Sequence, residues 1–197
     1  IHFLPADPGT RFAKDSRIAI DLDNPLDSER ILTPNVIRVP SGGYRMYYTG
    51  LGPGRRDPDG LGYILSAYSN DARIWQKDAG VRVDLFPPHA SARTLCPDVI
   101  PLSDGRWRMY FEARSPDRPT VILSALSEDG LRWTAEDGVR FGDDNWSYGT
   151  PRVIYVESGT HKEPLVLPNE WESFRQKRQG EVRYQLCQKI KETIARE

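Results

Sequence analysis

The feature that most constrains this chain is an internal repeat. Residues 96–115, "CPDVIPLSDGRWRMYFEARS", match residues 33–52, "TPNVIRVPSGGYRMYYTGLG", and a third unit of the same kind, "TPRVI", begins at Thr150. Residues 64–83 and 122–141 match each other in the same way, and residues 11–21 match the end of a unit. The repeat limits the chain to folds that are assembled from equivalent units.

Each repeat consists of short runs of β-branched and aromatic residues that are separated by turn signals such as "SGG", "SDG" and "EDG". This pattern predicts four antiparallel strands per unit, which is typical of a β-propeller blade whose two faces are both buried. We therefore expect an all-β, propeller-like array of four-stranded blades. It has two full blades at about 31–83 and 94–141 and partial repeats at 11–21 and 150–157. The structural alternative is a two-sheet sandwich, but the internal repeat argues against it.

The composition changes near residue 160, which suggests a propeller-like region over 1–159 and a polar linker with a helical tail over 160–197. In the tail, Val182, Leu186, Ile190 and Ile194 follow one another at roughly helical spacing, which predicts one or two amphipathic helices over 170–196. These helices could cover an open blade edge, join two chains, or form a solvated appendage.

The composition limits the classes of partner and cofactor that we expect for this protein. The 27 basic and 28 acidic residues nearly cancel, so we expect neither nucleic acid nor a membrane surface as partner. The cysteines Cys96 and Cys187 are far apart, and the three histidines lack ligand spacing, so we expect no disulfide framework, metal or cofactor. The first residues lack the basic and apolar regions of a signal peptide, which favours the cytoplasm; because the sequence does not begin with Met, a removed leader stays an open alternative.

Positions that are identical in successive repeats are interpreted as scaffold. They comprise Met46 and Met109, Tyr47 and Tyr110, Ser66 and Ser124, Ser69 and Ser127, Trp75 and Trp133, and the Gly-Val-Arg triplets at 80–82 and 138–140.

Positions that differ between the repeats are candidates for function. Asn35 of the first unit becomes Asp98 in the second and Arg152 in the third, and Thr49 becomes Glu112. Counting from a hairpin turn at 103–105 places Asp98 opposite Phe111 and beside Glu112, so both carboxyls are expected at one end of the blade, near the central channel. Such a channel, lined by polar and aromatic side chains, would suit a sugar. The structural alternative is that the carboxyls pair with Arg93, Arg114 or Arg152.

The blade pattern "P-x-V-I…Y-R-M-Y-Y…I-L-S-A-x-S-x-D-G-x-x-W" resembles the five-bladed propeller superfamily of glycoside hydrolases, the arabinanase, xylosidase and invertase type of families 43, 32, 68 and 130. The resemblance covers residues 12–157. It implies an aspartate on an early blade as base or nucleophile, a second aspartate that fixes geometry and tunes pKa, and a general-acid glutamate on a later blade. Asp98 and Glu112 match two of these places, whereas Asn35 and Arg152 depart from the family's pattern.

The sequence thus predicts a glycoside hydrolase-like protein that binds, and in one reading hydrolyses, a glycosidic bond. Asp98 and Glu112 are the expected catalytic carboxylates. The expected substrate-binding residues are Asn35, Arg93, Arg114, Arg152, Tyr47 and Tyr110. The alternatives are a non-catalytic propeller that binds carbohydrate or protein, and an incomplete propeller that associates with itself through its open blade edges or its C-terminal helix.

Overall fold

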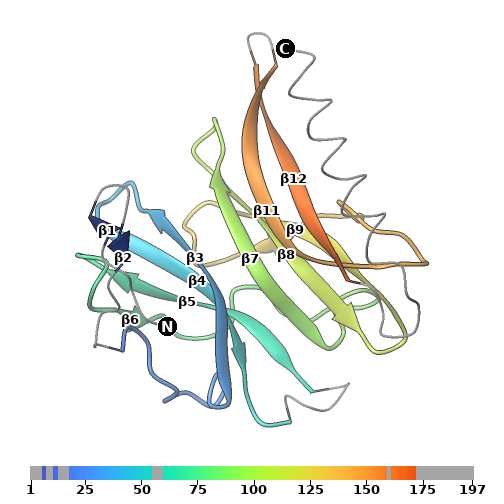
Figure 1. The fold of residues 1–197 in the computed structure, drawn as a ribbon, viewed down its shortest axis with the longest axis horizontal. Coiled ribbons are helices and arrows are strands. Elements are labelled where there is room, and N and C mark those ends of the chain that lie inside the picture. Colours follow the sequence, from blue (N-terminus) through green and yellow to red (C-terminus); the bar gives the residue numbers. More distant parts are fainter. Residues whose placement is uncertain (1–5, 8–10, 13–17, 55–59, 159–160, 172–197) are drawn as a thin grey trace.

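The structure, a computed structural model, describes residues 6–7, 11–12, 18–54, 60–158 and 161–171. Within these ranges the chain forms strands and loops and no helix, as Figure 1 shows. The strands are β1 (Ala6–Asp7), β2 (Arg11–Phe12), β3 (Arg30–Arg38), β4 (Tyr44–Leu51), β5 (Gly62–Ser69), β6 (Gln76–Lys77), β7 (Arg93–Pro101), β8 (Trp107–Ser115), β9 (Arg118–Ser127), β10 (Thr134–Ala135), β11 (Ser147–Ser158) and β12 (His161–Trp171).

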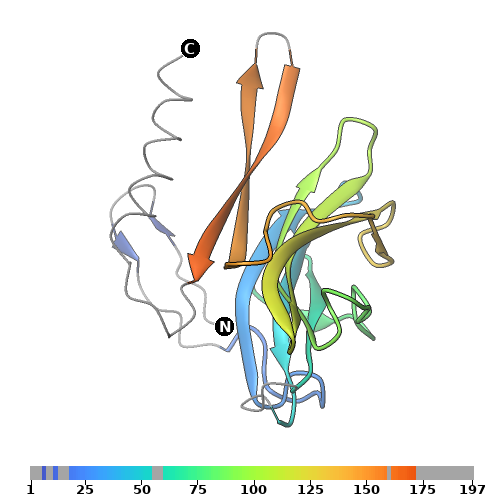
Figure 2. The ribbon, with the colours of Figure 1, turned by 90° about the vertical axis from the view of Figure 1, so that its right-hand side faces the viewer.

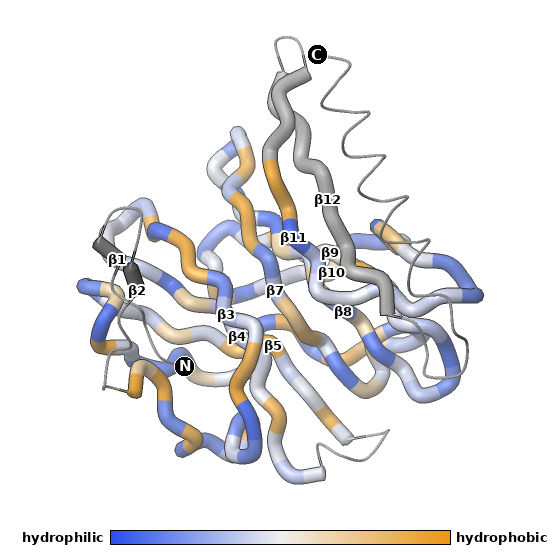
Figure 3. The backbone as a smooth tube through the Cα atoms, in the orientation of Figure 1, coloured by the Kyte–Doolittle hydropathy of each residue, from blue (hydrophilic) through white to orange (hydrophobic). Residues whose placement is uncertain are grey.

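The two full repeats form two equivalent four-stranded units. Blade 1 has the order β3-β4-β5-β6 and blade 2 the order β7-β8-β9-β10, and neighbouring strands within each blade are antiparallel. A single parallel bridge from Gly62 to Arg93 connects the two blades. Apolar stretches lie within the strands, and hydrophilic residues gather in the loops between them (Figure 3). The prediction of four antiparallel strands per repeat is confirmed.

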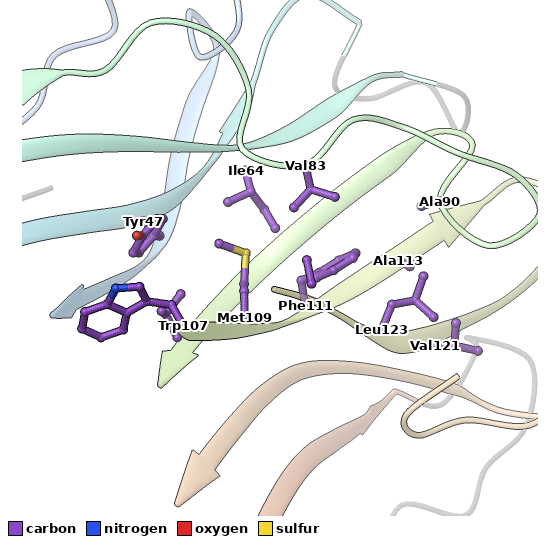
Figure 4. Packing of buried hydrophobic residues seen from close by; sticks show 12 residues of the cluster. Tyr47, Ile64, Val83, Ala90, Trp107, Met109, Phe111, Ala113, Val121 and Leu123 are labelled. Atoms are coloured by element: carbon purple, nitrogen blue, oxygen red, sulfur yellow. The ribbon is translucent and has the colours of Figure 1, made fainter. Parts of the chain in front are cut away.

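Both faces of blade 2 are buried, as a propeller blade requires. Met109 and Phe111 on β8 pack against Tyr47 and Ile64 of blade 1 in the cluster of Figure 4. The opposite face of β8 carries Tyr110, which belongs to a second cluster with Tyr148 and Val153 of β11. Complete burial of an apolar side chain of this size contributes about 1.5–3 kcal/mol. Burial on both faces therefore favours the blade arrangement over the solvated outer face of a sandwich.

A β-bulge interrupts the first strand of every repeat at the same place. The strand register shifts between Leu32 and Asn35 in β3, between Leu95 and Asp98 in β7, and between Gly149 and Arg152 in β11. The residue before the repeated proline has a positive φ in each case, namely 49° at Thr33, 52° at Cys96 and 48° at Thr150. A non-glycine residue with this backbone conformation is uncommon. Because the strain occurs three times, we conclude that the blade arrangement itself requires this bulge.

Scaffold residues form the same contacts in both blades. The hydroxyl of Ser66 donates to Asp78 at 2.6 Å, and that of Ser124 donates to Glu136 at 2.7 Å. The indole N–H of Trp75 donates to the carbonyl of Ala72, as that of Trp133 does to Gly130, each at 3.2 Å. These repeated residues thus hold the outer strands and turns of each blade in place through hydrogen bonds, which agrees with their interpretation as scaffold.

The third repeat is a long antiparallel hairpin of β11 and β12; its strand β11 lies against β7, β8 and β9, and the hairpin extends beyond them (Figure 2). Residues 161–169 were expected to be a polar linker, but they belong to β12 and pair with β11. The apolar run "PLVL" at 164–167 lies within this strand, and charged residues flank it. The helices expected over 170–196 lie outside the described residues from residue 172 onward.

Candidate functional site

The side chain that follows each repeated proline connects neighbouring first strands. The side-chain oxygen of Asn35 on β3 accepts a hydrogen bond from the backbone N–H of Val99 on β7 at 3.2 Å. One repeat later, Asp98 Oδ2 on β7 accepts from the backbone N–H of Val153 on β11 at 2.6 Å. Val99 and Val153 are themselves equivalent, so Asn35 and Asp98 perform the same structural task. The Asn35 amide also donates to Asp98 Oδ1 at 2.6 Å.

A second pair of variable positions repeats this behaviour. The hydroxyl of Thr49 on β4 accepts from the N–H of Cys96 at 2.8 Å, and Glu112 Oε2 on β8 accepts from the N–H of Thr150 at 3.1 Å. Cys96 and Thr150 are the strained residues of their bulges. The bulges at Cys96 and Thr150 therefore each present a backbone N–H, which the bulge leaves unpaired in the strand ladder, to a side chain of the preceding blade.

The register of blade 2 differs from the expected one. Pro101 pairs with Trp107, so Asp98 lies opposite Tyr110 rather than Phe111, and Leu95 lies opposite Glu112. The difference arises at the turn, where the Leu102 N–H donates to the carbonyl of Arg106 at 2.8 Å, so that Leu102 faces Arg106 and not Trp107. The bulge at Cys96 and Pro97 shifts the register again beyond Asp98 and places Leu95 opposite Glu112. Both carboxyls nevertheless contact β11, at amides three residues apart, and three residues of strand span at most about 10 Å.

Asp98 is almost buried, with 7% of its surface exposed. Burial raises the pKa of Asp98, while the hydrogen bond from the Val153 N–H and the charge of Arg152 oppose that shift. Of the residues that follow the three repeated prolines, Asp98 alone carries a carboxyl group. The fold therefore raises the proton affinity of a carboxyl at this repeat position in blade 2, where the other two repeats carry Asn35 and Arg152.

Glu112 is more deeply buried than Asp98, with 1% of its surface exposed. Its Oε1 accepts a hydrogen bond from Arg114 Nε at 2.5 Å, and the Arg114 side chain is 39% exposed. The structural alternative, in which one carboxyl pairs with an arginine, thus holds for Glu112. The pKa of the neighbouring Cys96 thiol is raised to about 11 by burial and by the Glu112 charge, so this thiol stays protonated near neutral pH.

Three of the other predicted site residues lie near the carboxyls. Tyr110 is buried opposite Asp98. Arg93 lies opposite Arg114 and donates to the carbonyl of Gly60 at 2.5 Å. Arg152 is exposed and precedes Val153. Tyr47 lies elsewhere: it is fully buried between the blades and donates its hydroxyl to the carbonyl of Gly130 at 2.8 Å. The structure therefore brings Asn35, Asp98, Glu112 and their neighbours together and leaves Tyr47 in the core.

Sequence reasoning missed two members of this site. Thr33 shares a 2.8 Å hydrogen bond with Thr49, and the Thr150 hydroxyl lies 3.8 Å from the Cys96 sulfur. The signal that could have found them is the repeated proline, because Thr33, Cys96 and Thr150 all precede it.

The described residues contain no group of three or more His, Cys, Asp or Glu that could hold a metal ion. Among the same residues there is no helix with the length and apolar character that crossing a membrane would need.

No protein-family model and no curated protein matches this sequence. Solved structures do match. The sucrose-6-phosphate hydrolase of Lactobacillus gasseri is 19% identical with a TM-score of 0.59, over 76% of this chain and 30% of its own. A family 117 glycoside hydrolase of Zobellia galactanivorans is 20% identical with a TM-score of 0.53, over 69% and 48%. A putative glycoside hydrolase of Parabacteroides distasonis is 12% identical with a TM-score of 0.54, over 67% and 40%.

These likenesses define the class of fold: the described β region has the fold of the propeller-type glycoside hydrolases. The resemblance found in the sequence is confirmed at this level. The chain spans less than half the length of each of these three solved chains, and their low sequence identity leaves the activity of this chain to be argued from its own residues.

Proposed function

We propose that the protein binds a carbohydrate and takes part in hydrolysing a glycosidic bond as part of a five-bladed propeller. Asp98 and Glu112 are the proposed carboxylates, and Asn35, Arg93, Arg114, Arg152 and Tyr110 the surrounding groups. The observation that carries the proposal is that Asp98, a nearly buried carboxyl with a raised pKa, contacts Asn35 on the preceding first strand and the Val153 amide on the following one.

The chemistry of glycosidic hydrolysis fits two carboxyls with different surroundings. One carboxylic acid protonates the leaving oxygen, and a second carboxylate acts as base or nucleophile. The raised pKa of Asp98 favours proton exchange at this group, while Glu112 is oriented by Arg114 and by the Thr150 amide. Asn35 holds Asp98 Oδ1 and so restricts the orientation of that carboxyl.

A swap of two side chains tests the proposal. In Asp98→Asn alone, the oxygen of the new side chain would still accept from the Val153 N–H, so its NH2 group would face the NH2 group of Asn35. Two donors would then face each other without an acceptor. In the double variant Asn35→Asp with Asp98→Asn, every hydrogen bond has a donor and an acceptor again, but the carboxyl has moved to blade 1. We expect the double variant to keep the wild-type melting temperature and to lose at least about 100-fold in kcat on aryl glycosides.

If the swapped variant instead kept the wild-type kcat, hydrolysis would not depend on Asp98. A useful control is Arg73→Gln, which changes an exposed residue in the outer turn of blade 1 and should leave kcat unchanged. Any wild-type turnover has to be measured first, with a panel of aryl glycosides.

A non-catalytic carbohydrate-binding propeller is the second candidate, and a specific observation favours it. Both carboxyls accept hydrogen bonds at positions where blade 1 uses the neutral residues Asn35 and Thr49 for the same purpose. Carbohydrate binding by wild-type protein, with no turnover of any glycoside in the panel, would support this second candidate over the first.

A further inference from the structure

We propose that Cys96 is a positioning residue that acts on the proposed reaction through Glu112. Its thiol fills the place beside this carboxyl where a threonine hydroxyl would bind a carboxylate oxygen, so that the carboxylate keeps an electron pair for the reaction. The inference deepens the proposed function and rests on it for the role of Glu112. It starts from the residue before the repeated proline, which is cysteine in blade 2 and threonine in the other two repeats.

The backbone does not explain the cysteine. Thr33, Cys96 and Thr150 have nearly the same positive φ, 49°, 52° and 48°, so threonine adopts this conformation in the other two repeats. In blade 1 the hydroxyls of Thr33 and Thr49 share a hydrogen bond of 2.8 Å. The first two strands of blade 2 pair in the same register as those of blade 1. The pair in blade 2 that is equivalent to Thr33 and Thr49 is therefore Cys96 and Glu112.

The thiol lies within the network of contacts that holds Glu112. The Cys96 sulfur is 3.8 Å from the Thr150 hydroxyl, and the N–H of the same Thr150 donates to Glu112 Oε2 at 3.1 Å. The other carboxylate oxygen, Oε1, accepts from Arg114. Burial, and after it the Glu112 charge, raise the pKa of the Cys96 thiol to about 11, which agrees with a short distance between the two groups. The thiol therefore stays protonated beside the carboxyl.

A hydroxyl and a thiol differ strongly as hydrogen-bond donors. A hydroxyl that donates to a carboxylate forms a strong, charge-assisted bond, whereas a thiol is a weak donor. Cys96→Thr would therefore stabilise the ionised form of Glu112 and weaken it as a proton acceptor. Blade 1 combines threonine with the neutral Thr49, and blade 2 combines cysteine with the carboxyl. The chain thus lacks the strong donor in the blade that carries the carboxyl.

Two arginines also act on Glu112. Arg114 lies on the same strand and donates to it. Arg93 on β7 is close enough for the Glu112 charge to oppose the lowering of the Arg93 pKa, which is due to burial and to the Arg114 charge. The contact from β11, Thr150, is uncharged. Because arginine stays protonated throughout the titration of a carboxyl, substitutions at Cys96 change the local donor and leave these charges in place.

The test is a titration of the Glu112 carboxyl by NMR of its carboxyl carbon in the whole chain, with the signal assigned by its loss in Glu112→Gln. Cys96→Ser and Cys96→Thr supply a hydroxyl, and Cys96→Ala supplies no donor. We expect the protonation midpoint to lie about one pH unit lower in the Ser and Thr variants than in wild type, and to be unchanged in Cys96→Ala. The Ser variant keeps the test decisive if the extra methyl group of threonine prevents folding. Cys187→Ser, the same change at the other cysteine, should leave the midpoint unchanged.

Two results would overturn the inference: a midpoint that stays at the wild-type value in Cys96→Ser, and a midpoint that moves as far in Cys96→Ala as in Cys96→Ser. Cys96 also packs in an apolar cluster with Leu51 and Leu95, and a role in packing alone would lower the melting temperature of the variants without moving the midpoint.

Turnover is scored separately, on the panel of aryl glycosides. The acid limb of the pH profile of kcat/KM should move to lower pH in Cys96→Ser by the same amount as the midpoint. No turnover by wild type would remove the proposed function, while a shifted midpoint would still support the effect of Cys96 on the carboxyl. Turnover with an acid limb that is unmoved in Cys96→Ser would remove only this inference.

Discussion

Blade 1 and blade 2 have the same strands, the same bulge and the same outer turns, yet they differ at the positions that connect them to the next blade. Blade 1 uses Asn35 and Thr49, and blade 2 uses Asp98 and Glu112, to accept backbone hydrogen bonds from the following first strand. The comparison teaches that the scaffold requires an acceptor at these positions but no charge. The carboxyls of blade 2 are therefore additional to what the fold needs, and this is the reason to seek chemistry there.

A third difference concerns the outer polar cluster of each blade. In blade 2, Arg108 donates two hydrogen bonds to Glu136, each at 2.9 Å. In blade 1, the equivalent contact is a single ion pair from Arg45 to Asp78 at 3.3 Å. Aspartate is one methylene group shorter than glutamate, which explains why the fork of the arginine is fully matched in blade 2 alone.

The largest expected effect comes from giving blade 1 the carboxyl of blade 2. Thr49 is completely buried, and the residue equivalent to Arg114 in blade 1 is the apolar Leu51. The variant Thr49→Glu would bury a carboxyl without an arginine partner, so we expect a loss of about 3–5 kcal/mol in the free energy of unfolding, measured by urea denaturation.

The reverse change is the matched control. Glu112→Thr keeps an acceptor for the Thr150 amide and leaves a half-exposed Arg114, so the expected loss is about 1–2 kcal/mol. Adding Leu51→Arg to Thr49→Glu should make the double loss smaller than the sum of the two single losses. A loss for Thr49→Glu no greater than that for Glu112→Thr would show that charge is tolerated in either blade.

The polar clusters give a smaller and pH-dependent contrast. Burial acts to raise the pKa of Glu136, but hydrogen bonds from Ser124 and Arg108 outweigh it, and the pKa is held below its ordinary value of 4.5. We expect Glu136→Gln to cost about 2 kcal/mol at pH 7, because it breaks a partly exposed bidentate pair. Asp78→Asn, which breaks a single longer contact with an arginine and leaves an oxygen to accept from Ser66, should cost about 1 kcal/mol or less.

The pH dependence has a definite sign. A carboxyl whose pKa is lower in the folded state stabilises the protein above its unfolded-state pKa, and this contribution is lost as pH falls through the folded-state pKa. The difference between wild type and Glu136→Gln should therefore be complete above about pH 5 and should shrink as the pH is lowered below 4.5. Urea denaturation of both proteins between pH 3 and pH 7 provides the measurement, and a difference that grew on acidification would contradict the assignment.

Much of the fold could be predicted from the sequence, since the repeat fixes the number of strands in a blade and their order. The register of β7 and β8 could not, because it depends on how the turn closes between Leu102 and Arg106 and on a bulge at Cys96 and Pro97 whose backbone conformation most residues avoid. Residues 161–169 were interpreted as a linker because of their charge, whereas pairing with β11 determines that they form a strand.

The candidate site was predicted in part. Comparison of the repeats found Asn35, Asp98 and Glu112, but the structural alternative that it offered was pairing with an arginine and did not include hydrogen bonds from the backbone of the next blade. The structural task of these side chains depends on which backbone amides the next blade presents. That contact lies between blades and cannot be read from the sequence of one strand. Tyr47 was assigned both to scaffold and to substrate binding, and its complete burial agrees with the first assignment.

The smallest expected effect compares the outer turns, where Ala72 in blade 1 is equivalent to Gly130 in blade 2. Both residues have a positive φ, 59° at Ala72 and 72° at Gly130, a conformation that glycine adopts without strain. Ala72→Gly should therefore stabilise the protein by up to about 1 kcal/mol. Gly130→Ala should destabilise it by more than that, because its new Cβ would lie 2.8 Å from the Tyr47 hydroxyl oxygen, which hydrogen-bonds to this residue. Thermal unfolding of the two variants checks the contrast, and shifts of the melting temperature in the same direction would mean that the two turns are not equivalent in energy.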